Sequence, residues 1–138
     1  YFCDLQQVDC FEQILKTDKV VQCSVYHPEA KKHVLPALSA FKECIEIYLS
    51  ENMWVDIHRL GVDKGTGLQE LQQRYGITAG ESMAFGDYLN DIGLMKACTH
   101  TFAMKNSHPA LAAMCKYQIG SNNENAVVGA IKKWFHIG

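Results

Sequence analysis

The second part of the chain alternates helical spacing with short apolar runs. Leu68, Leu71 and Tyr75 recur at helical intervals and predict a helix over residues 64–75 with these side chains packed inward. Gly76 follows at the position where a left-handed residue commonly ends a helix. The further elements expected are a strand at 83–85, a helix from 92, a strand at 100–104, a helix at 109–115, a strand at 117–119 and a helix at 124–134. This alternation predicts an α/β fold with a parallel sheet and flanking helices.

Residues 1–59 have a different pattern, in which short strands can pair as neighbours. The expected elements are a helix at 5–15, a strand at 19–26, a helix at 28–42, and strands at 44–49 and 53–58 joined by a hairpin loop at 50–52. In the last strand, Trp54 and Asp56 alternate with Val55 and Ile57. The first part therefore predicts a small mixed α/β unit with antiparallel pairing.

Polar residues suited to chemistry follow the apolar run at 83–85. Gly86 breaks the run, and Asp87, Asn90 and Asp91 follow within one turn. The carboxyl end of a strand in an open α/β sheet is where ligands bind. The N–H groups of the next helix favour an anion such as phosphate, and the carboxylates favour a divalent cation. The alternative is a turn in which Asn90 or Asp91 only caps the helix.

Lys64 is a second candidate because it stands at a helix start, where the helix dipole disfavours a cation. The alternative is an ordinary solvated lysine. Gly65 and Gly67 would allow another backbone to approach closely. Known nucleotide-binding loops do not match, because Lys64 precedes its glycine and Glu70 stands where the dinucleotide motif needs glycine.

Composition removes several classes of function. The net charge of −2 gives no electrostatic basis for binding nucleic acid or an anionic membrane. No apolar run approaches the ~20 residues of a membrane span. The 6 cysteines never form C-x-x-C and lie mostly in apolar segments, which favours buried reduced thiols over disulfides or zinc ligands. The 6 histidines have no metal-binding spacing, so surface or loop positions are expected. We therefore expect a reducing, cytoplasmic location.

Three motifs in order resemble one protein family. Lys-Gly-x-Gly-Leu begins at Lys64, Gly-Asp-x-x-Asn-Asp-x-x-x-Met begins at Gly86, and Ala-Met-x-Asn ends at Asn106. Together they resemble the haloacid dehalogenase (HAD) superfamily of phosphatases. The resemblance is to the Cof-type subfamily with a class IIB cap, which includes sugar-phosphate and flavin-phosphate phosphatases, and it covers residues 59–134.

The resemblance implies how the chain is organised. Residues 60–138 would be the C-terminal half of a Rossmann-like HAD core, and residues 1–59 part of the α/β cap that precedes it. The chain begins with Tyr1 and not with methionine. We therefore expect only the C-terminal half of such an enzyme.

The resemblance also implies an activity and the residues that perform it. The activity would be Mg²⁺-dependent hydrolysis of a small phosphomonoester, a sugar phosphate or similar metabolite, through an aspartyl-phosphate. Lys64 matches the lysine that neutralises the phosphoryl group and its nucleophile, Asn90 the asparagine that contacts phosphate, Asp87 the Mg²⁺ ligand, and Asp91 the second acid, which orients the metal's water shell. A magnesium ion and a fixed lysine suit phosphoryl transfer, since both offset its negative charge. Asn106 would lie near a loop over the site, or would cap the helix that begins near Pro109.

The sequence departs from the family at the nucleophile. The family carries Asp-x-Asp-x-Thr on its first core strand, and no Asp-x-Asp occurs in this sequence. The second phosphate-binding motif, a Ser or Thr after a strand that precedes the cap, is also missing. We therefore expect this chain alone to be inactive. The alternatives left open are a non-catalytic binding or interaction module and a phosphomannomutase-like phosphotransferase.

Three structural expectations follow. Lys64 and Asp87 should converge at the carboxyl edge of the parallel sheet. The strand that leads to Asp87 should have one side without a partner, so the isolated chain should either need its N-terminal half or self-associate through that edge. Tyr48, Trp54 and His58 could face a substrate from the cap. For these three residues, however, we expect a place in the core of the hairpin.

Overall fold

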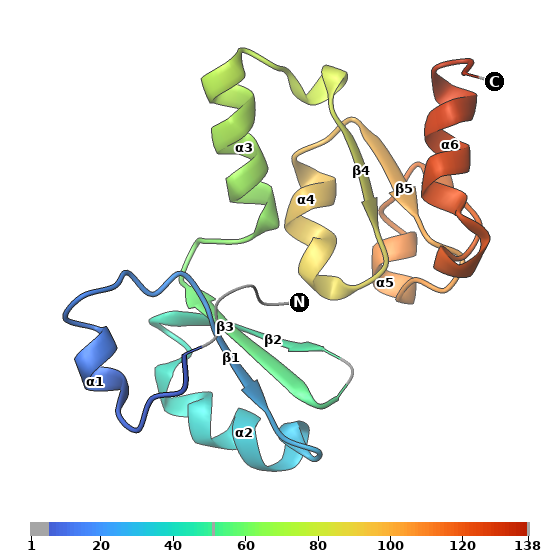
Figure 1. The fold of residues 1–138 in the computed structure, drawn as a ribbon. Helices are drawn as coiled ribbons and strands as arrows, with labels where there is room; N and C mark the ends of the chain where they lie inside the picture. The colour runs from blue at the N-terminus through green and yellow to red at the C-terminus, as the bar shows by residue number, and fades with distance from the viewer. Residues whose placement is uncertain (1–5, 51, 138) are drawn as a thin grey trace.

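The computed structural model describes residues 6–50 and 52–137, which form two three-stranded sheets with surrounding helices (Figure 1). The first sheet precedes residue 60 and the second follows it. Tyr1, Cys3, the first residue of the helix expected at 5–15 and the middle residue of the loop expected at 50–52 lie outside the described residues. The mixed α/β class is confirmed, with antiparallel pairing in the first sheet and parallel pairing in the second.

The first sheet contains β1 (Cys23–Tyr26), β2 (Ile45–Ser50) and β3 (Trp54–Arg59), in the order β1-β3-β2. The backbone N–H of Met53 donates to the carbonyl oxygen of Ser50 over 3.2 Å and closes the turn between β2 and β3. The predicted hairpin is therefore present, and its two strands pair over their whole length.

The two faces of this sheet differ in chemistry. Asp56 on β3 lies opposite Ser24 on β1 and Tyr48 on β2, so these three side chains share one polar face. Val55, on the other face, is fully buried, as is Ala30. Ala30 begins α2 (Ala30–Leu38), which is followed by the 3-10 turn η1 (Ser39–Phe41) and lies against one side of the sheet in Figure 1. The helix therefore covers the apolar face and leaves the polar face open.

The beginning of the chain has less regular structure than its apolar spacing predicts. Helix α1 (Phe11–Ile14) is a single turn with no buried residue, and Phe11 is 75% exposed. Of the strand expected over residues 19–26, only β1 forms. Apolar residues that find no partner surface cannot stabilise so short a helix, because helix nucleation is unfavourable by itself.

The second sheet contains the parallel strands β4 (Met83–Gly86), β5 (His100–Ala103) and β6 (Tyr117–Gln118), in the order β4-β5-β6. In one row across it, the ring of Phe102 on β5 stacks on Phe85 of β4 and on Tyr117 of β6, with ring centroids 4.9 and 4.8 Å apart. Within residues 6–50 and 52–137, no strand pairs with the other side of β4.

Helices cover this sheet on both sides (Figure 1). The elements are α3 (Lys64–Tyr75), α4 (Ile92–Lys96), α5 (Pro109–Ala112), α6 (Ala126–Trp134) and the 3-10 turns η2 (Ala79–Glu81), η3 (Leu89–Asp91) and η4 (Asn122–Glu124). α3 and α4 lie together on one side and α6 on the other, where Trp134 packs edge-on against Phe102. The carboxyl end of β4 and the starts of α3 and α4 lie toward the first sheet.

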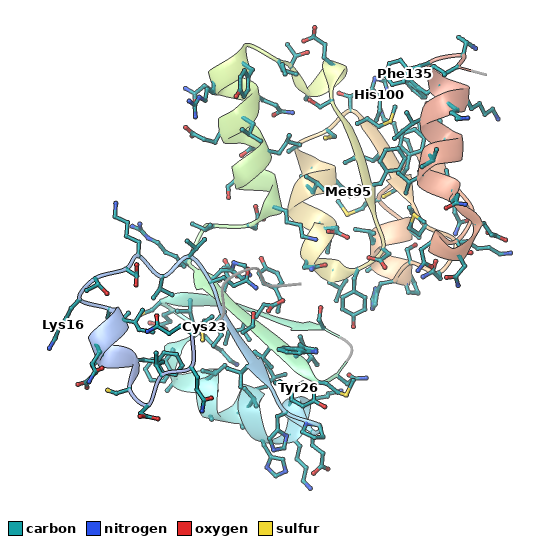
Figure 2. All side chains as sticks on the ribbon, in the orientation of Figure 1. Lys16, Cys23, Tyr26, Met95, His100 and Phe135 are labelled. Carbon is teal, nitrogen blue, oxygen red and sulfur yellow. The ribbon has the colours of Figure 1, made fainter. Side chains whose placement is uncertain are left out.

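A small core of buried apolar side chains joins α4, α5 and β4. Ala84, Met95 and Leu111 form its centre, and each is at most 3% exposed. Figure 2 shows Met95 between α4 and the strands. This packing holds the loop between β4 and α4, because it anchors the elements on both sides of that loop.

The inward face of α3 differs from the predicted one. Leu71 is 50% exposed and Tyr75 is 66% exposed. The inner position belongs to Gln72, whose side-chain N–H₂ donates to Ser82 Oγ (2.8 Å) and to the carbonyl oxygen of Ala97 (3.0 Å). Leu71 and Tyr75 lie four residues apart on a neighbouring stripe of the helix, so the polar anchor at Gln72 turns them outward.

The expectation that the cysteines are buried is wrong for three of the five described ones. Cys10, Cys23 and Cys44 are exposed, and Cys98 and Cys115 are half-buried. All five are free thiols. Burial raises the pKa of Cys98 and Cys115 above that of an exposed thiol. Among the described residues, no helix is both long enough and apolar enough to span a bilayer.

Candidate functional site

The start of α3 is defined by a reciprocal capping box. Asp63 Oδ1 accepts a hydrogen bond from the backbone N–H of Thr66 over 2.7 Å. The backbone N–H of Asp63 donates to Thr66 Oγ1 over 2.9 Å. Because both orphan donors are satisfied, the helix begins at Lys64 as predicted.

The turn after β4 is organised around the carboxylate of Asp91. Asp91 is a buried residue, with 5% of its surface exposed. Its Oδ2 accepts hydrogen bonds from the backbone N–H groups of Asp87 (3.1 Å) and Tyr88 (3.5 Å). Gly86 is required here, since a Cβ would lie 2.8 Å from Asp91 Oδ2 and 2.6 Å from Met95 Cε. Asp91 occupies the N-cap position of α4, but its side chain makes no capping hydrogen bond to that helix.

Lys64 and Asp91 meet across the two helix starts. Lys64 Nζ lies 2.5 Å from Asp91 Oδ1, with the lysine side chain 53% exposed and the aspartate side chain 6% exposed. Lys64 and Asp87 line one cavity of about 280 Å³ at the carboxyl end of β4. The predicted convergence of Lys64 and Asp87 is therefore confirmed, and the partner that holds the ammonium group is Asp91.

Two glycines bring α3 and α4 close enough for this ion pair. A Cβ on Gly65 would overlap the backbone of Gly93, lying 2.9 Å from its Cα and closer still to its carbonyl group. A Cβ on Gly93 would overlap the carboxylate of Asp63. The close backbone approach that Gly65 was expected to permit is therefore present, and Gly93 is a further glycine at the contact.

Asp87 is the carboxylate available to a metal ion. It is exposed, and among the described residues its side chain has no hydrogen bond or ion pair. No group of three or more His, Cys, Asp and Glu side chains in residues 6–50 and 52–137 could hold a metal. A single hard oxygen donor fits Mg²⁺, which is commonly bound by one or two carboxylates together with phosphate oxygens and water.

Asn90 opens on a second cavity, of about 210 Å³, that lies between the two sheets. Its wall comprises Gln22, Tyr48, Asp56, His58, Asp63, Lys64 and Asn90. The polar face of the first sheet thus faces Lys64 and Asn90. The expectation that Tyr48 and His58 lie in a hairpin core is wrong, because register places them on the open face of the sheet.

Tyr48 and His58 form the aromatic part of that wall. Their rings meet edge to face with centroids 5.6 Å apart. Burial, together with the negative charges of Glu46 and Asp63, raises the pKa of Tyr48 above its usual value. A tyrosine phenol is protonated at neutral pH even at its usual pKa of about 10, so this phenol can donate a hydrogen bond. Trp54 is also outside any core, since it is 44% exposed and packs on Tyr26 with ring centroids 5.0 Å apart.

The loop after β5 is fastened to the site by backbone contacts. The backbone N–H of His108 donates to the carbonyl oxygen of Asp87 over 2.7 Å. His108 caps α5, with Nδ1 accepting from the N–H of Ala110 over 3.2 Å. The cap expected at Asn106 is therefore wrong, and Asn106 is exposed. Sequence reasoning missed His108 because histidine is not a usual capping residue.

The comparisons with known proteins agree with this fold. The family model described as haloacid dehalogenase-like hydrolase matches residues 6–131, and the chain belongs to that family. A 5-amino-6-(5-phospho-D-ribitylamino)uracil phosphatase of Escherichia coli is 40% identical over 79 residues, which is 57% of this chain and 29% of that protein. A phosphatase of the same name from Bacillus subtilis is 31% identical over 106 residues, covering 77% of this chain and 42% of that protein.

Solved structures show the same architecture over nearly the whole chain. A protein of Streptococcus mutans superposes with a TM-score of 0.78 and 26% identity, covering 94% of this chain and 49% of that one. A Plasmodium vivax protein described as a HAD/COF-like hydrolase gives a TM-score of 0.80 and 25% identity, covering 92% of this chain and 46% of that one. This chain therefore spans less than half the length of the relatives it matches.

Proposed function

We propose that this chain comprises part of the cap and the metal-binding half of the core of a phosphatase that hydrolyses a small phosphomonoester with Mg²⁺. In this proposal residues 1–59 belong to the cap and residues 60–138 to the core. One observation carries it: Lys64 is held against the buried Asp91, beside the exposed Asp87, at the carboxyl end of a parallel strand. Phosphoryl transfer needs a fixed cation and a metal ligand beside the phosphoryl group, and the strand end brings these two groups together.

Each residue has a separate task in the proposed reaction. Lys64 binds the phosphoryl group and offsets the charge that develops on its oxygens. Asn90, whose amide has no hydrogen-bond partner among the described residues, donates to a phosphate oxygen. Asp87 would hold Mg²⁺, which supplies Lewis-acid stabilisation of the phosphoryl oxygens when bound. Asp91 positions Lys64 and, as in the family, would orient the water around the metal.

The substrate class follows from the relatives and is part of the proposal. Three relatives are named as phosphatases of 5-amino-6-(5-phospho-D-ribitylamino)uracil and two as HMP-PP phosphatases. A small phosphorylated metabolite is therefore the proposed partner. The five free cysteines suit a reducing, cytoplasmic location.

A second candidate is a non-catalytic binding module. The observation in its favour is that no Asp-x-Asp occurs among the 138 residues, so the chain contains no nucleophile of the family type. The ion pair and cavity would then bind a phosphorylated ligand without cleaving it.

The test is to express the full-length product of the reading frame and to measure release of phosphate from small phosphate esters. We expect Mg²⁺-dependent turnover, accompanied by an Asp-x-Asp-x-Thr motif in the translated sequence. Asp87→Asn should abolish turnover, whereas Asp9→Asn, at an exposed carboxylate outside both cavities, should leave it unchanged. Absence of turnover with every ester tried, despite binding of one of them, would favour the binding module.

A further inference from the structure

The polar face of the first sheet holds a preorganised carboxylate opposite the phosphate site. Asp56 Oδ1 accepts from Ser24 Oγ over 2.6 Å and from Gln22 Nε2 over 3.0 Å. Gln22 Nε2 also donates to Ser24 Oγ over 3.0 Å. Ser24 lies in β1 and Gln22 directly precedes it, and β1 pairs with the strand that carries Asp56. These bonds therefore fix the orientation of the carboxylate. Asp56 Oδ2 has no partner among the described residues, and Asp56 lines the cavity that Lys64 and Asn90 also line.

Negative charge outweighs positive charge on the wall of this cavity. The ammonium group of Lys64 is offset by Asp91, which lies outside the cavity wall. Asp56 and Asp63 add two negative charges to the wall. A ligand can place its phosphate near Lys64, but a second anionic group toward Asp56 would meet a carboxylate without a neutralising cation. Like charges at close range in a partly desolvated site oppose binding.

We propose that Asp56 is a specificity residue for the leaving group, and that the leaving group carries hydroxyl or N–H donors and no second anionic group. This inference rests on the proposed phosphate site. A fixed carboxylate oxygen with a free lone pair accepts hydrogen bonds and cannot donate them. Esters of small polyols therefore fit, and phosphorylated carboxylic acids do not.

The other residues of the wall agree with a small polyol ester. Tyr48 and His58 present an aromatic edge against which a carbon chain can pack. The protonated phenol of Tyr48 adds a hydrogen-bond donor to the same wall. The cavity of about 210 Å³ is small for a drug-sized ligand and suits a leaving group of a few carbons.

Binding by calorimetry, with Mg²⁺ omitted so that no ester is hydrolysed, tests the inference in the full-length protein. Erythritol 4-phosphate supplies hydroxyl donors, phosphoglycolate supplies a second anion, and phenyl phosphate supplies neither. We expect erythritol 4-phosphate to bind at least about 10-fold more tightly than phosphoglycolate, the scale of a hydrogen bond to a charged group. Asp56→Asn should remove most of this difference and leave phenyl phosphate unaffected.

Glu43→Gln is the matched control, since Glu43 is an exposed carboxylate that lines neither this cavity nor the one beside Asp87. It should preserve the preference. The comparison of the three esters needs no variant and therefore stands even where Asp56→Asn fails to fold. Equal or tighter binding of phosphoglycolate, no binding of any ester, or an unchanged preference in Asp56→Asn would each overturn the inference. Binding with the expected preference but without hydrolysis in the presence of Mg²⁺ would instead contradict the proposed phosphatase activity.

Discussion

Lys64 Nζ donates to Asp91 Oδ1 over 2.5 Å, although 27 positions separate the two residues in the chain. Lysine at a helix start opposes the helix dipole, so the pair compensates for an unfavourable local placement. The same carboxylate accepts from the backbone N–H groups of Asp87 and Tyr88. One buried side chain therefore fixes the ammonium group of Lys64 and the turn that carries Asp87 together.

Lys64→Met should lower the free energy of unfolding by about 1–2 kcal/mol, because it leaves a desolvated carboxylate without its cation. The value is modest, since the lysine side chain is half exposed and solvent screens the pair. Urea denaturation measures it. Lys96→Met, at an exposed lysine in α4, is the control and should change stability little. Equal effects of the two substitutions would show that the ion pair contributes nothing particular.

Gly93→Ala should destabilise the protein by about 1–3 kcal/mol, because the added methyl overlaps the Asp63 carboxylate that caps α3. Gly67→Ala, in the neighbouring helix α3, is the control, since its added Cβ would have nothing within 4 Å and the substitution should stabilise that helix by up to about 1 kcal/mol. Thermal unfolding separates the two variants. Combining Gly93→Ala with Asp63→Ser, which shortens the cap, should recover part of the loss. No recovery would show that the clash lies elsewhere.

Glu81 and Glu124 are the capping carboxylates of η2 and η4. They should stabilise the protein at pH values above the ordinary glutamate pKa, and this stabilisation should be lost in acid. Hydrogen bonds from Thr78 lower the pKa of Glu81, and hydrogen bonds from Ser121 lower that of Glu124. A lowered folded-state pKa means that stability falls as pH drops from about 4.3 through the folded-state value. Acid titrations of Glu124→Gln and Glu81→Gln should show a weaker pH dependence than the parent protein. Glu70→Gln, an exposed residue without such a cap, should match the parent.

The 138-residue chain by itself should hydrolyse no phosphomonoester at an enzymatic rate. Covalent catalysis of the family type needs an aspartate that no Asp-x-Asp in this sequence supplies, and loss of a nucleophile commonly costs on the order of 10⁴–10⁶ in rate. An aryl phosphate assay with added Mg²⁺ measures it. Turnover that Asp87→Asn abolishes in this chain would contradict the prediction.

The open side of β4 should make the 138-residue chain self-associate. In the described residues β4 pairs with β5 alone, and an uncovered apolar edge can accept a strand from another chain. Light scattering over a dilution series should show a mass that rises with concentration. Met83→Lys, which places a charge on this strand, should reduce the association. A stable, cooperatively folding monomer at micromolar concentration would rule the edge out as an association surface.

Local features of the chain could be predicted because they depend on residues a few positions apart. α3 begins at Lys64 and ends at Tyr75 as expected, since Asp63 caps its start and Gly76 takes a φ of 67° after its end. β4 and β5 follow from short apolar runs in the same way. Where local spacing had no surface to pack on, as around Phe11, it overestimated the helix.

Sequence alone identified Lys64, Asp87, Asn90 and Asp91 as the candidate site and predicted the α/β class. Tertiary structure decided which of them touch. Helix packing at Gly65 and Gly93 pairs Lys64 with Asp91, and strand register turns Tyr48, Asp56 and His58 toward the site. The physical reason is that capping and periodicity act within a few residues, whereas these contacts join distant segments whose spacing only the packed fold sets.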